Sequence, residues 1–373
     1  MPQAAYVHIP FCAHHCDFCD FAVAVGVDDR METYCQVVSR EIEERLGGRA
    51  AFQPLKSVFY GGGTPGYLPA HWLAVIHESL AKAGGIDVDA EVTLETTPET
   101  VSLENARAWL AVGINRISIG VESLDDRELA AMGRQGSRRQ AFLAIEAARA
   151  AGFTNISCDL MYGLPEQTLE SWQSTLRDLL ATPIQHLSAY GLTIAAQSSL
   201  LLRYPRDSEA YPDDVLNEKL YETLVASAED SGFTQYEISN FSRPGYESRH
   251  NLVYWKNDEY FGFGVSAHRY VDRVRSSNLR SFARYMLNCL ENESEEEIDD
   301  KTRLKEAIFL ALRTRAGIDL AAFSRRYGVD LINTYGSKID KLCAGGFLEL
   351  AGGALRLTQK GVLVSNLVMS EFM

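Results

Sequence analysis

The sequence lacks any long apolar run. None of its 373 residues lies in a stretch approaching the ~20 consecutive apolar residues that cross a bilayer. It also lacks a basic leader with an apolar core, because strand-like residues begin at Ala5. These absences argue against a membrane-spanning or secreted protein. They predict a cytoplasmic one, whose contact with membranes is limited to transient contact with their surface.

An excess of positive charge is missing as well. The chain has 36 lysines and arginines against 50 aspartates and glutamates, a formal net charge of −14. A surface of this charge repels a polyanion, which argues against non-specific nucleic-acid binding by the whole protein. The charge is uneven, however, since residues 301–373 contain 11 basic and 6 acidic side chains. That net of +5 leaves −19 for the rest of the chain.

The seven cysteines do not suit a framework of disulfides, because their number is odd. Three of them fall within eight residues, at Cys12, Cys16 and Cys19. The other four are scattered along the chain: Cys35, Cys158, Cys289 and Cys343. In a reducing cytosol, clustered thiols are more often ligands than bridges.

Short apolar, β-branched runs alternate with longer amphipathic stretches over roughly the first 240 residues. The predicted strands are Ala5–Ile9, Ser57–Tyr60, Glu91–Glu95, Arg116–Gly120, Asn155–Met161, His186–Thr193 and Phe233–Ile238. The predicted helices include Arg30–Leu46, Pro98–Val112, Arg139–Ala151, Leu169–Leu180 and Asp213–Ser231. This alternation indicates βαβ units and a parallel sheet. The fold class is therefore α/β, and we expect an open, partial (β/α)6-type barrel rather than a closed eightfold one.

The segment Glu291–Asp300 carries seven acidic residues in ten, which is typical of a solvated linker or helix end. We place a domain boundary there, between a barrel domain at 1–290 and a C-terminal module at 301–373. The module contains predicted helices at Arg303–Thr314, Leu320–Tyr327 and Leu331–Ala344, a hairpin at Phe347–Thr358, and a last apolar helix. Three helices with a small hairpin outline a winged-helix-like module.

The three clustered cysteines form a C-x₃-C-x₂-C loop directly after the first predicted strand. Iron–sulfur cubanes are held by cysteine thiolates, usually four, so three from one loop leave one iron open. The amine and carboxylate of S-adenosylmethionine (SAM) can chelate such an iron, and one electron from the cluster can cleave its sulfonium. The alternative is a zinc site of the Cys₃His type, with His14 or His15 as the fourth ligand.

Polar residues and glycines follow the predicted strands at their C-terminal ends. After the first strand come the cysteines, and after the second comes Gly61-Gly62-Gly63-Thr64-Pro65. The next four ends carry Glu95, Glu122, Asp159 and Thr193. In a parallel sheet these ends share one face, where such folds bind ligands. Each acidic residue alone could equally be a helix N-cap, and the glycines alone a plain turn.

Several longer motifs resemble one known family. They are YVHIPFC at Tyr6–Cys12, GGGTP at Gly61–Pro65, ISIGVES at Ile117–Ser123, DLMYGLPEQT at Asp159–Thr168, YEISNF at Tyr236–Phe241 and PGYESRHNLVYW at Pro244–Trp255. Together they are similar to the radical SAM, oxygen-independent coproporphyrinogen III oxidase-like family, over nearly the whole chain.

Within that family the sequence is more similar to the haem chaperone (HemW) branch. The oxidases continue the cysteine loop with a further cysteine, where this chain has Phe21, and they carry an N-terminal extension before the first strand. The His-Asn-x-x-Tyr-Trp signature of the chaperone branch stands at His250, Asn251, Tyr254 and Trp255.

The resemblance implies roles for individual residues. It implies that Cys12, Cys16 and Cys19 hold a [4Fe-4S] cluster. The predicted SAM-binding residues are Tyr6, Phe18, Gly62, Gly63, Thr64, Glu95, Glu122, Arg134, Asp159 and Thr193. Two positions depart from the family pattern, because Glu122 stands where glutamine is usual and Gly136 where a histidine is common.

The function that the resemblance implies is a haem chaperone that transfers haem to respiratory haem proteins, with a haem donor protein as a further partner and a homodimeric state. His250 is the predicted axial ligand and His268 the second candidate, although His250 alone is typical of a buried structural histidine. The alternative function is a radical SAM oxidase that decarboxylates coproporphyrinogen III or a related tetrapyrrole. A third, nucleic-acid binding by the basic C-terminal module, is disfavoured because +5 is a modest charge.

Overall fold

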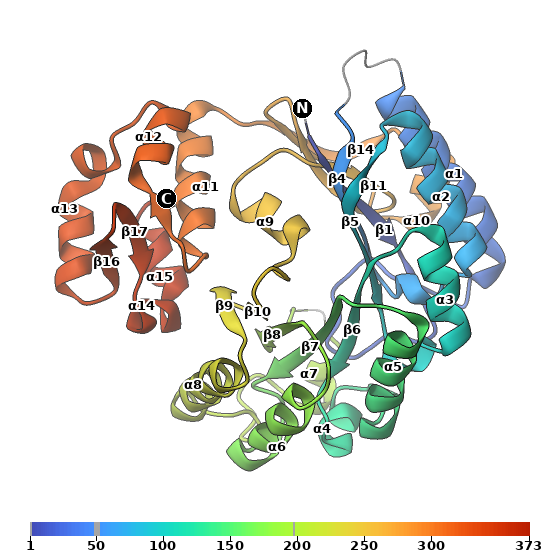
Figure 1. The fold of residues 1–373 in the computed structure, drawn as a ribbon, viewed down its shortest axis with the longest axis horizontal. Helices are drawn as coiled ribbons and strands as arrows, with labels where there is room; N and C mark the ends of the chain where they lie inside the picture. The colour runs from blue at the N-terminus through green and yellow to red at the C-terminus, as the bar shows by residue number, and fades with distance from the viewer. Residues whose placement is uncertain (1, 48–52, 197) are drawn as a thin grey trace.

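The computed structural model describes residues 2–47, 53–196 and 198–373. Its main element is a curved nine-stranded sheet in the order β11-β1-β4-β5-β6-β7-β8-β10-β9 (Figure 1). Seven consecutive members run parallel: the short edge strand β11 (Phe261–Phe263) and six others, which are β1 (Ala4–Ile9), β4 (Leu55–Gly62), β5 (Ile86–Thr96), β6 (Arg116–Glu122), β7 (Ile156–Tyr162) and β8 (His186–Gly191). The predicted α/β fold with an open, partial barrel is confirmed.

Helices cover the outer face of this sheet (Figure 1). They are α1 (Met31–Leu46), α2 (Ala70–Ala83), α3 (Leu103–Val112), α5 (Arg138–Ala151), α6 (Leu169–Leu180) and α8 (Asp214–Asp230). Four of them start at a side chain that accepts a backbone N–H of the first turn, namely Ser102, Ser137, Thr168 and Asp213. These capping side chains fix the residue at which each of the four helices begins.

The two faces of the sheet differ in polarity. In β4, Val58 and Tyr60 are buried and belong to the apolar core shared with the outer helices, and the hydroxyl of Tyr60 reaches the ring of His77 on α2. The inner face is polar although buried, with Ser57, Thr93, Arg116, Ser118 and Ser188 among its members. Strands buried on both faces usually read as continuous apolar runs. This polar inner face is therefore a first sign of a functional interior.

The edges of the sheet were not fully predicted. The segment predicted at Phe233–Ile238 forms β9 (Thr234–Glu237), but it is not a seventh neighbouring parallel strand. An unpredicted strand, β10 (Asn240–Ser242), pairs antiparallel with both β8 and β9 and separates them. At the other edge, the short strand β11 (Phe261–Phe263) lies parallel to β1.

Most of the acidic segment at 291–300 is a strand rather than a linker, and its last two residues form a helix end as predicted, because Asp299 caps α11 (Asp300–Leu312) and Asp300 begins it. Its residues form β14 (Asn292–Glu297), which pairs antiparallel with β13 (Val274–Asn278), beside β12 (His268–Val271). The glutamates of β14 are exposed, as the composition predicts, so the segment is solvated while taking part in a three-stranded sheet.

The last part of the chain forms a small module, on the left of Figure 1. Its elements are α11 (Asp300–Leu312), β15 (Ile318–Asp319), α12 (Leu320–Tyr327), α13 (Leu331–Ala344), β16 (Leu348–Ala351), β17 (Ala354–Leu357), α14 (Gln359–Leu363) and α15 (Ser365–Ser370). The expected three helices and hairpin are present, and the last apolar helix is split into α14 and α15. Arg275 on β13 contacts Glu306 on α11 through two hydrogen bonds of 2.8 and 2.7 Å, which ties the module to the barrel.

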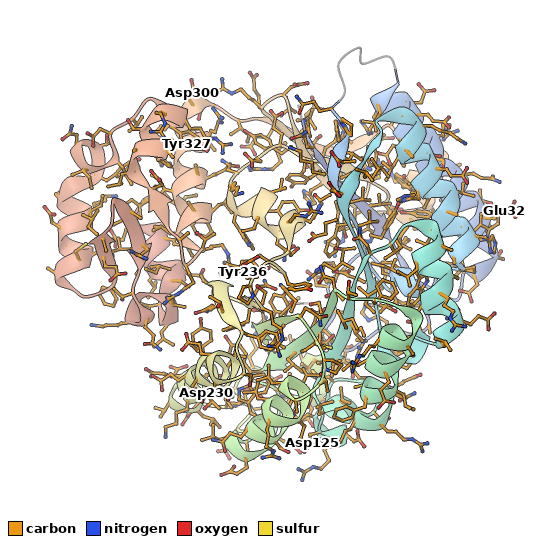
Figure 2. All side chains as sticks on the ribbon, in the orientation of Figure 1. Glu32, Asp125, Asp230, Tyr236, Asp300 and Tyr327 are labelled. Atoms are coloured by element: carbon orange, nitrogen blue, oxygen red, sulfur yellow. The ribbon has the colours of Figure 1, made fainter. Side chains whose placement is uncertain are left out.

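A short helix, α9 (Arg249–Trp255), lies inside the curve of the large sheet, between it and the module (Figure 1). Figure 2 shows side chains filling this interior, with Tyr236 pointing inward while Glu32 and Asp230 point outward at the rim. The remaining short elements are β2 (Phe11–Cys12), β3 (Ala24–Val25), α4 (Asp126–Ala131), α7 (Leu200–Arg203) and α10 (Phe282–Leu287). No helix within the described residues is long and apolar enough to cross a membrane.

Candidate functional site

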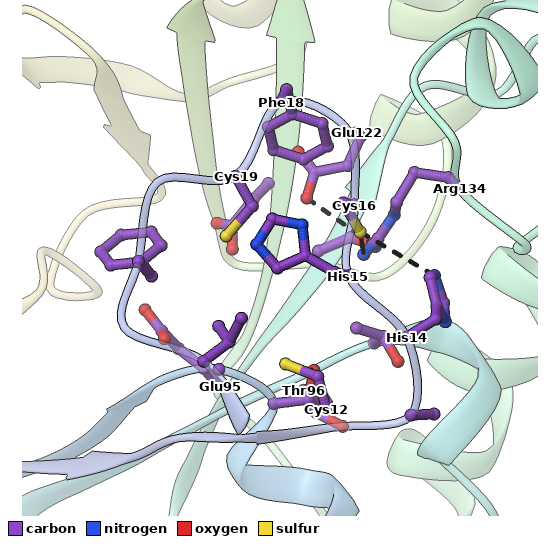
Figure 3. Close-up of a pocket in the computed structure, with 18 of the residues that line it drawn as sticks. Cys12, His14, His15, Cys16, Phe18, Cys19, Glu95, Thr96, Glu122 and Arg134 are labelled. Atoms are coloured by element: carbon purple, nitrogen blue, oxygen red, sulfur yellow. Dashed lines mark hydrogen bonds and ion pairs between the residues drawn. The ribbon is translucent and has the colours of Figure 1, made fainter. Parts of the chain in front are cut away.

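The cysteine loop lies over the C-terminal ends of the parallel strands. Cys12 ends β2, and the loop carries Cys16 and Cys19 before the chain returns to β3. All three thiols are free and line one cavity of about 600 Å³ (Figure 3). The thiol of Cys12 lies 3.5 Å from the hydroxyl of Thr64, on the loop after β4. The first two strand ends of the sequence argument therefore meet in space.

Most of the predicted cofactor-binding residues line the same cavity. Besides the three cysteines, they are Phe18, Gly62, Gly63, Thr64, Glu95, Glu122, Arg134, Asp159 and Thr193. Thr193 lies two residues beyond the end of β8, although its prediction placed it within the strand. Tyr6 is not among the lining residues, and its hydroxyl lies 3.1 Å from Nδ1 of His8 instead. The four residues of the haem signature are also elsewhere, on α9.

The glycine turn after β4 is shaped by close approach. Gly62 has a φ of +116°, and a Cβ there would lie 2.5 Å from the ring of His8. A Cβ on Gly63 would lie 2.6 Å from the carbonyl oxygen of Pro10 and 2.9 Å from the sulfur of Cys12. The backbone N–H of Gly62 donates to the Glu95 carboxylate at 3.0 Å. Glycine is thus required here so that the turn can pass beside the cysteine loop.

Buried carboxyl groups form the inner wall of the cavity. Burial, with the nearby Asp159 in addition, raises the pKa of Glu95 to about 7. Burial also raises the pKa of Glu122 to about 7, and Arg134 opposes this change. Asp159 accepts hydrogen bonds from the Ser118 hydroxyl at 3.0 and 3.1 Å, while burial raises its pKa too. Carboxyl groups held this way favour a cationic ligand, which would restore their ionised form.

Arg134 is the cation of the site. Its guanidinium lies 3.6 Å from the sulfur of Cys16 and 3.8 Å from the carboxylate of Glu122, and it donates to the carbonyl oxygen of Gly120 (Figure 3). A buried guanidinium beside a thiol stabilises the thiolate, the form that binds iron. Glu122 has a φ of +64°, an uncommon backbone conformation for a residue other than glycine, and this aims its carboxylate at Arg134.

The donor set fits an iron–sulfur cluster better than a single metal ion. Sulfur ligands of one zinc ion, each at ~2.3 Å, lie within about 4 Å of each other. The described residues contain no group of three or more histidine, cysteine, aspartate or glutamate side chains that could hold such an ion. His14, the alternative fourth ligand, has Nε2 at 3.8 Å from the sulfur of Cys16, a spacing that a shared metal ion would also allow, so this contact does not separate the two kinds of site. Three thiols around one cavity suit a larger, four-iron group, which would supply the electron for sulfonium cleavage.

Part of the cavity wall consists of residues that were not predicted from the sequence. Thr96, Thr97, Glu99 and Thr100 follow Glu95 directly and line the cavity, as do Gln135 and Tyr190. The sequence could have indicated the threonines, because they directly follow the predicted strand end at Glu95 and lead into the capping turn before α3. Tyr190 was hidden inside an apolar strand, and only the inward side of β8 identifies it.

The haem-signature residues form a second, closed environment. The Glu91 carboxylate accepts the backbone N–H groups of Arg249 and His250 at 3.1 and 3.0 Å, which fixes the start of α9. The ring of His250 lies between the hydroxyls of Ser57 and Tyr254, at 3.0 and 2.8 Å. Burial lowers the pKa of His250 to about 3, with a further contribution from Arg116.

The ring of Trp255, at the end of α9, faces the C-terminal module. The guanidinium of Arg313 lies over it at 4.6 Å. Asn251 donates its backbone N–H to the hydroxyl of Ser248, the N-cap of the helix. The haem signature thus joins the barrel to the module.

Comparison with known proteins gives consistent results. The model of the radical SAM superfamily matches residues 6–179, and that of the HemN C-terminal domain matches residues 298–364. A Bacillus subtilis protein named heme chaperone HemW is 32% identical, covering 100% of this chain and 99% of that protein. A Synechocystis protein of the same name is 36% identical, covering 86% and 80%.

Two further proteins extend the comparison. The mouse mitochondrial radical S-adenosyl methionine domain-containing protein 1 is 33% identical, covering 97% of this chain and 85% of its own length. The structure of Escherichia coli coproporphyrinogen III oxidase (HemN), a radical SAM enzyme, superposes with a TM-score of 0.87 over 100% of this chain and 90% of that one. At 22% identity this likeness shows the shared fold. The chain belongs to the HemN-like family of radical SAM proteins, in the branch whose curated members are named heme chaperone HemW.

Proposed function

We propose that this protein is a haem chaperone, which binds haem and transfers it to respiratory haem proteins. The observation that carries the proposal is its similarity over the whole chain to curated proteins named heme chaperone HemW, at 32% identity for the Bacillus subtilis protein. The [4Fe-4S] cluster and SAM implied by the family would be held by the cysteine loop and the strand ends around the cavity.

The residue after the cysteine loop supports this choice over a coproporphyrinogen oxidase. Phe21 stands where the oxidases carry a further cysteine, and its side chain is 64% exposed on the cavity lining. Its ring is therefore available to contact an apolar ligand at the cavity. The residues of the predicted SAM site are common to both functions. The position that distinguishes the two functions is therefore Phe21.

The remaining expectations belong to the same proposal. The chain would divide into a barrel domain at 1–290 and a module at 301–373, work in the cytoplasm, touch membranes only transiently and form a homodimer. Its partners would be a haem donor protein and haem-accepting respiratory proteins. The net charge of −14 for the chain and the modest +5 for residues 301–373 argue against a nucleic-acid partner.

Transfer of haem is the test. Protein reconstituted anaerobically with iron and sulfide is loaded with haem and mixed with the haem-free form of a b-type respiratory cytochrome. We expect the haem spectrum of the cytochrome to appear faster than from free haem at the same concentration. A parallel sample receives coproporphyrinogen III, SAM and a reductant. Release of carbon dioxide there, with no saturable binding of haem, would show that the protein is an oxidase instead.

A further inference from the structure

A second cavity, of about 470 Å³, lies beside the edge strand β11 and shares no lining residue with the cavity at the cysteine loop. Its volume lies in the range of pockets that hold small organic ligands, about 300–1,000 Å³. Two arginines, Arg45 of α1 and Arg269 of β12, share its lining with the apolar side chains of Phe263, Val271 and Leu290. None of these residues belongs to the predicted cluster, SAM or haem sites, so this cavity is a separate candidate site.

Arg269 is a buried cation without a carboxylate in contact. The residue is 8% exposed, and its guanidinium donates to the amide oxygens of Asn278 and Asn292 at 2.8 and 2.5 Å. Within the part of the chain that the structure describes, these two neutral oxygens are its hydrogen-bond acceptors, and it forms no ion pair. Burial of a charge is costly when no opposite charge accompanies it. An anion in the cavity would offset that cost.

The buried carboxylate of Glu41 cannot serve as that anion, because its oxygens are already engaged. Four groups donate to them, namely Nε of Arg45 at 2.8 Å, the amide of Asn278 at 2.7 Å, the hydroxyl of Tyr285 at 2.7 Å and the backbone N–H of Gly264 at 2.9 Å. A carboxylate offers about four lone-pair sites. Glu41 therefore fixes the position of Arg45 and has no site left for Arg269.

The two guanidinium groups lie close together because they share acceptors. Arg45 donates to the same amide oxygens of Asn278 and Asn292, at 3.3 and 3.4 Å. Burial, and then the charge of Arg45, lower the pKa of Arg269 to about 10, so Arg269 is still a cation at pH 7.

Both arginines also keep donors in reserve. Among the described residues, nothing accepts a hydrogen bond from Nε of Arg269 or from Nη1 of Arg45, and neither nitrogen is sealed from solvent. Two adjacent guanidinium groups with unused donors on the wall of one cavity are suited to an oxyanion, which each can contact through its planar fork.

The charges around the cavity favour a small phosphorylated molecule. A phosphate monoester carries about −1.5 to −2 charges at pH 7 and three acceptor oxygens, which match two guanidinium groups better than a single carboxylate does. Phe263 and Leu290 offer apolar surface to an attached organic group. Glu44 on the lining is exposed, and so are the four glutamates of β14. These acidic groups repel an extended anionic surface such as a membrane of acidic lipids.

We propose that this cavity binds the phosphate group of a small soluble molecule, with Arg45 and Arg269 holding the phosphate oxygens and the apolar lining holding the organic part. The inference goes beyond the proposed transfer of haem and does not depend on it. Bound phosphate would also link α1 to β12, since it would bridge an arginine from each element.

The test is calorimetric titration of the cluster-reconstituted protein with inorganic phosphate at constant ionic strength. We expect saturable binding, which Arg269→Gln weakens roughly tenfold or more because hydrogen bonds to a charged group are lost. Arg40→Gln is the control, since it removes the same charge from α1 at an exposed position outside the cavity lining. It should bind phosphate as the unmodified protein does, and both variants should keep their iron content.

A variant on the rim keeps the test decisive if Arg269→Gln does not fold. Glu44→Gln removes an exposed negative charge from the lining and should tighten phosphate binding about twofold at low salt. Glu43→Gln, which changes an exposed residue outside the lining, should have a smaller effect. Absence of saturable phosphate binding, or no tightening in Glu44→Gln, would overturn the proposal.

Two further arms identify the source of the phosphate. Glycerol 3-phosphate should bind at least as tightly as inorganic phosphate, and acetate at the same ionic strength should bind more weakly than either. Vesicles of phosphatidylglycerol should not sediment the protein. Acetate binding as tight as that of phosphate would contradict the choice of ligand. Sedimentation with the vesicles that phosphate reverses would assign the cavity to a lipid headgroup instead of a soluble molecule.

Discussion

The two ends of the barrel interior are built on opposite principles. At the C-terminal strand ends, thiols, carboxyl groups and glycines surround a cavity of about 600 Å³, and burial raises the pKa of Glu95 and of Glu122 to about 7. Around α9, the buried histidines His250 and His186 have both ring nitrogens hydrogen-bonded. The difference teaches that polarity alone does not mark a binding site. In the first region the buried carboxyl groups face the open space of a cavity, whereas in the second the ring of His250 is engaged by a hydroxyl group at each nitrogen.

The largest effect should follow from loss of a cavity thiol. Cys16→Ser should abolish the cluster, because a hydroxyl is a poor iron ligand and two remaining thiolates do not hold a cubane. Anaerobic iron and sulfide analysis, with the electron-spin spectrum taken with and without SAM, measures this. Cys343→Ser is the control, since that thiol lies outside the cavity in the C-terminal module and should leave the iron content unchanged. A normal cluster in Cys16→Ser would contradict the site.

A substitution in the hydrogen-bonded region around α9 should instead lower the stability of the fold. His250→Ala leaves the buried hydroxyls of Ser57 and Tyr254 without a partner and opens a cavity beside Phe59. We expect the free energy of unfolding to fall by about 3–4 kcal/mol. Urea titration followed by circular dichroism measures it. His15→Ala, at the exposed cysteine loop, should change it by less than about 0.5 kcal/mol. Equal effects of the two variants would remove the distinction between the regions.

The residues of the cavity were predicted from the sequence better than the hydrogen-bonded contacts around α9. Cysteine spacing and polar strand ends are local signals, and the parallel sheet brings them together as expected, so nine of the predicted cofactor residues share the cavity with the three cysteines. Tyr6 and His250 also stand in motifs, but no local pattern shows whether a polar group is satisfied. The partner of His250 is Ser57, which only long-range packing brings close, whereas Tyr6 contacts His8 two residues along the same strand, on the same face.

The fold shows the same division. The six parallel strands follow from apolar runs between capped helices, while the sheet β12–β14 was missed. Four of the six residues of β14 are exposed glutamates, which have low β-propensity, and the strand shows no alternation of apolar and polar residues. It forms because β13 offers a partner and because Arg275 and Arg269 on the neighbouring strands supply positive charge. Pairing of this kind depends on distant residues, and composition alone indicated a linker.

A substitution of Gly62, beside the cavity, tests how far close packing at this turn supports SAM binding. Gly62→Ala places a Cβ against the His8 ring at a φ of +116°, and should cost about 2–3 kcal/mol of stability and weaken SAM binding. Gly245 also has a positive φ, of +84°, but nothing lies within 4 Å of a Cβ there. Gly245→Ala should therefore cost about 1 kcal/mol and leave SAM binding unchanged. Thermal unfolding and equilibrium dialysis with SAM separate the two, and equal losses would mean that backbone strain alone matters.

The smallest effect is a pH dependence with opposite signs at the two ends. Glu95 and Glu122 have folded pKa values of about 7, above the unfolded value of 4.5, so their protonated forms favour folding at low pH. That contribution is lost as the pH rises from 4.5 through 7, by roughly 1–2 kcal/mol after screening by water in the cavity. His250 has a folded pKa of about 3, below the unfolded value of 6.5. Its contribution is full above pH 6.5 and is lost as the pH falls toward 3.

The two windows overlap between pH 4.5 and 6.5, so cluster-free protein should lose stability below pH 4.5 through His250 and between pH 6.5 and 7 through the two glutamates. The double variant Glu95→Gln, Glu122→Gln should flatten the decline of the unfolding temperature on the alkaline side only. His250→Asn should flatten the acidic side only, at a lower overall stability. Circular-dichroism melts from pH 4 to pH 9 resolve both. If either variant altered the opposite side, the open cavity and the closed network would be one coupled system rather than two independent ends of the barrel.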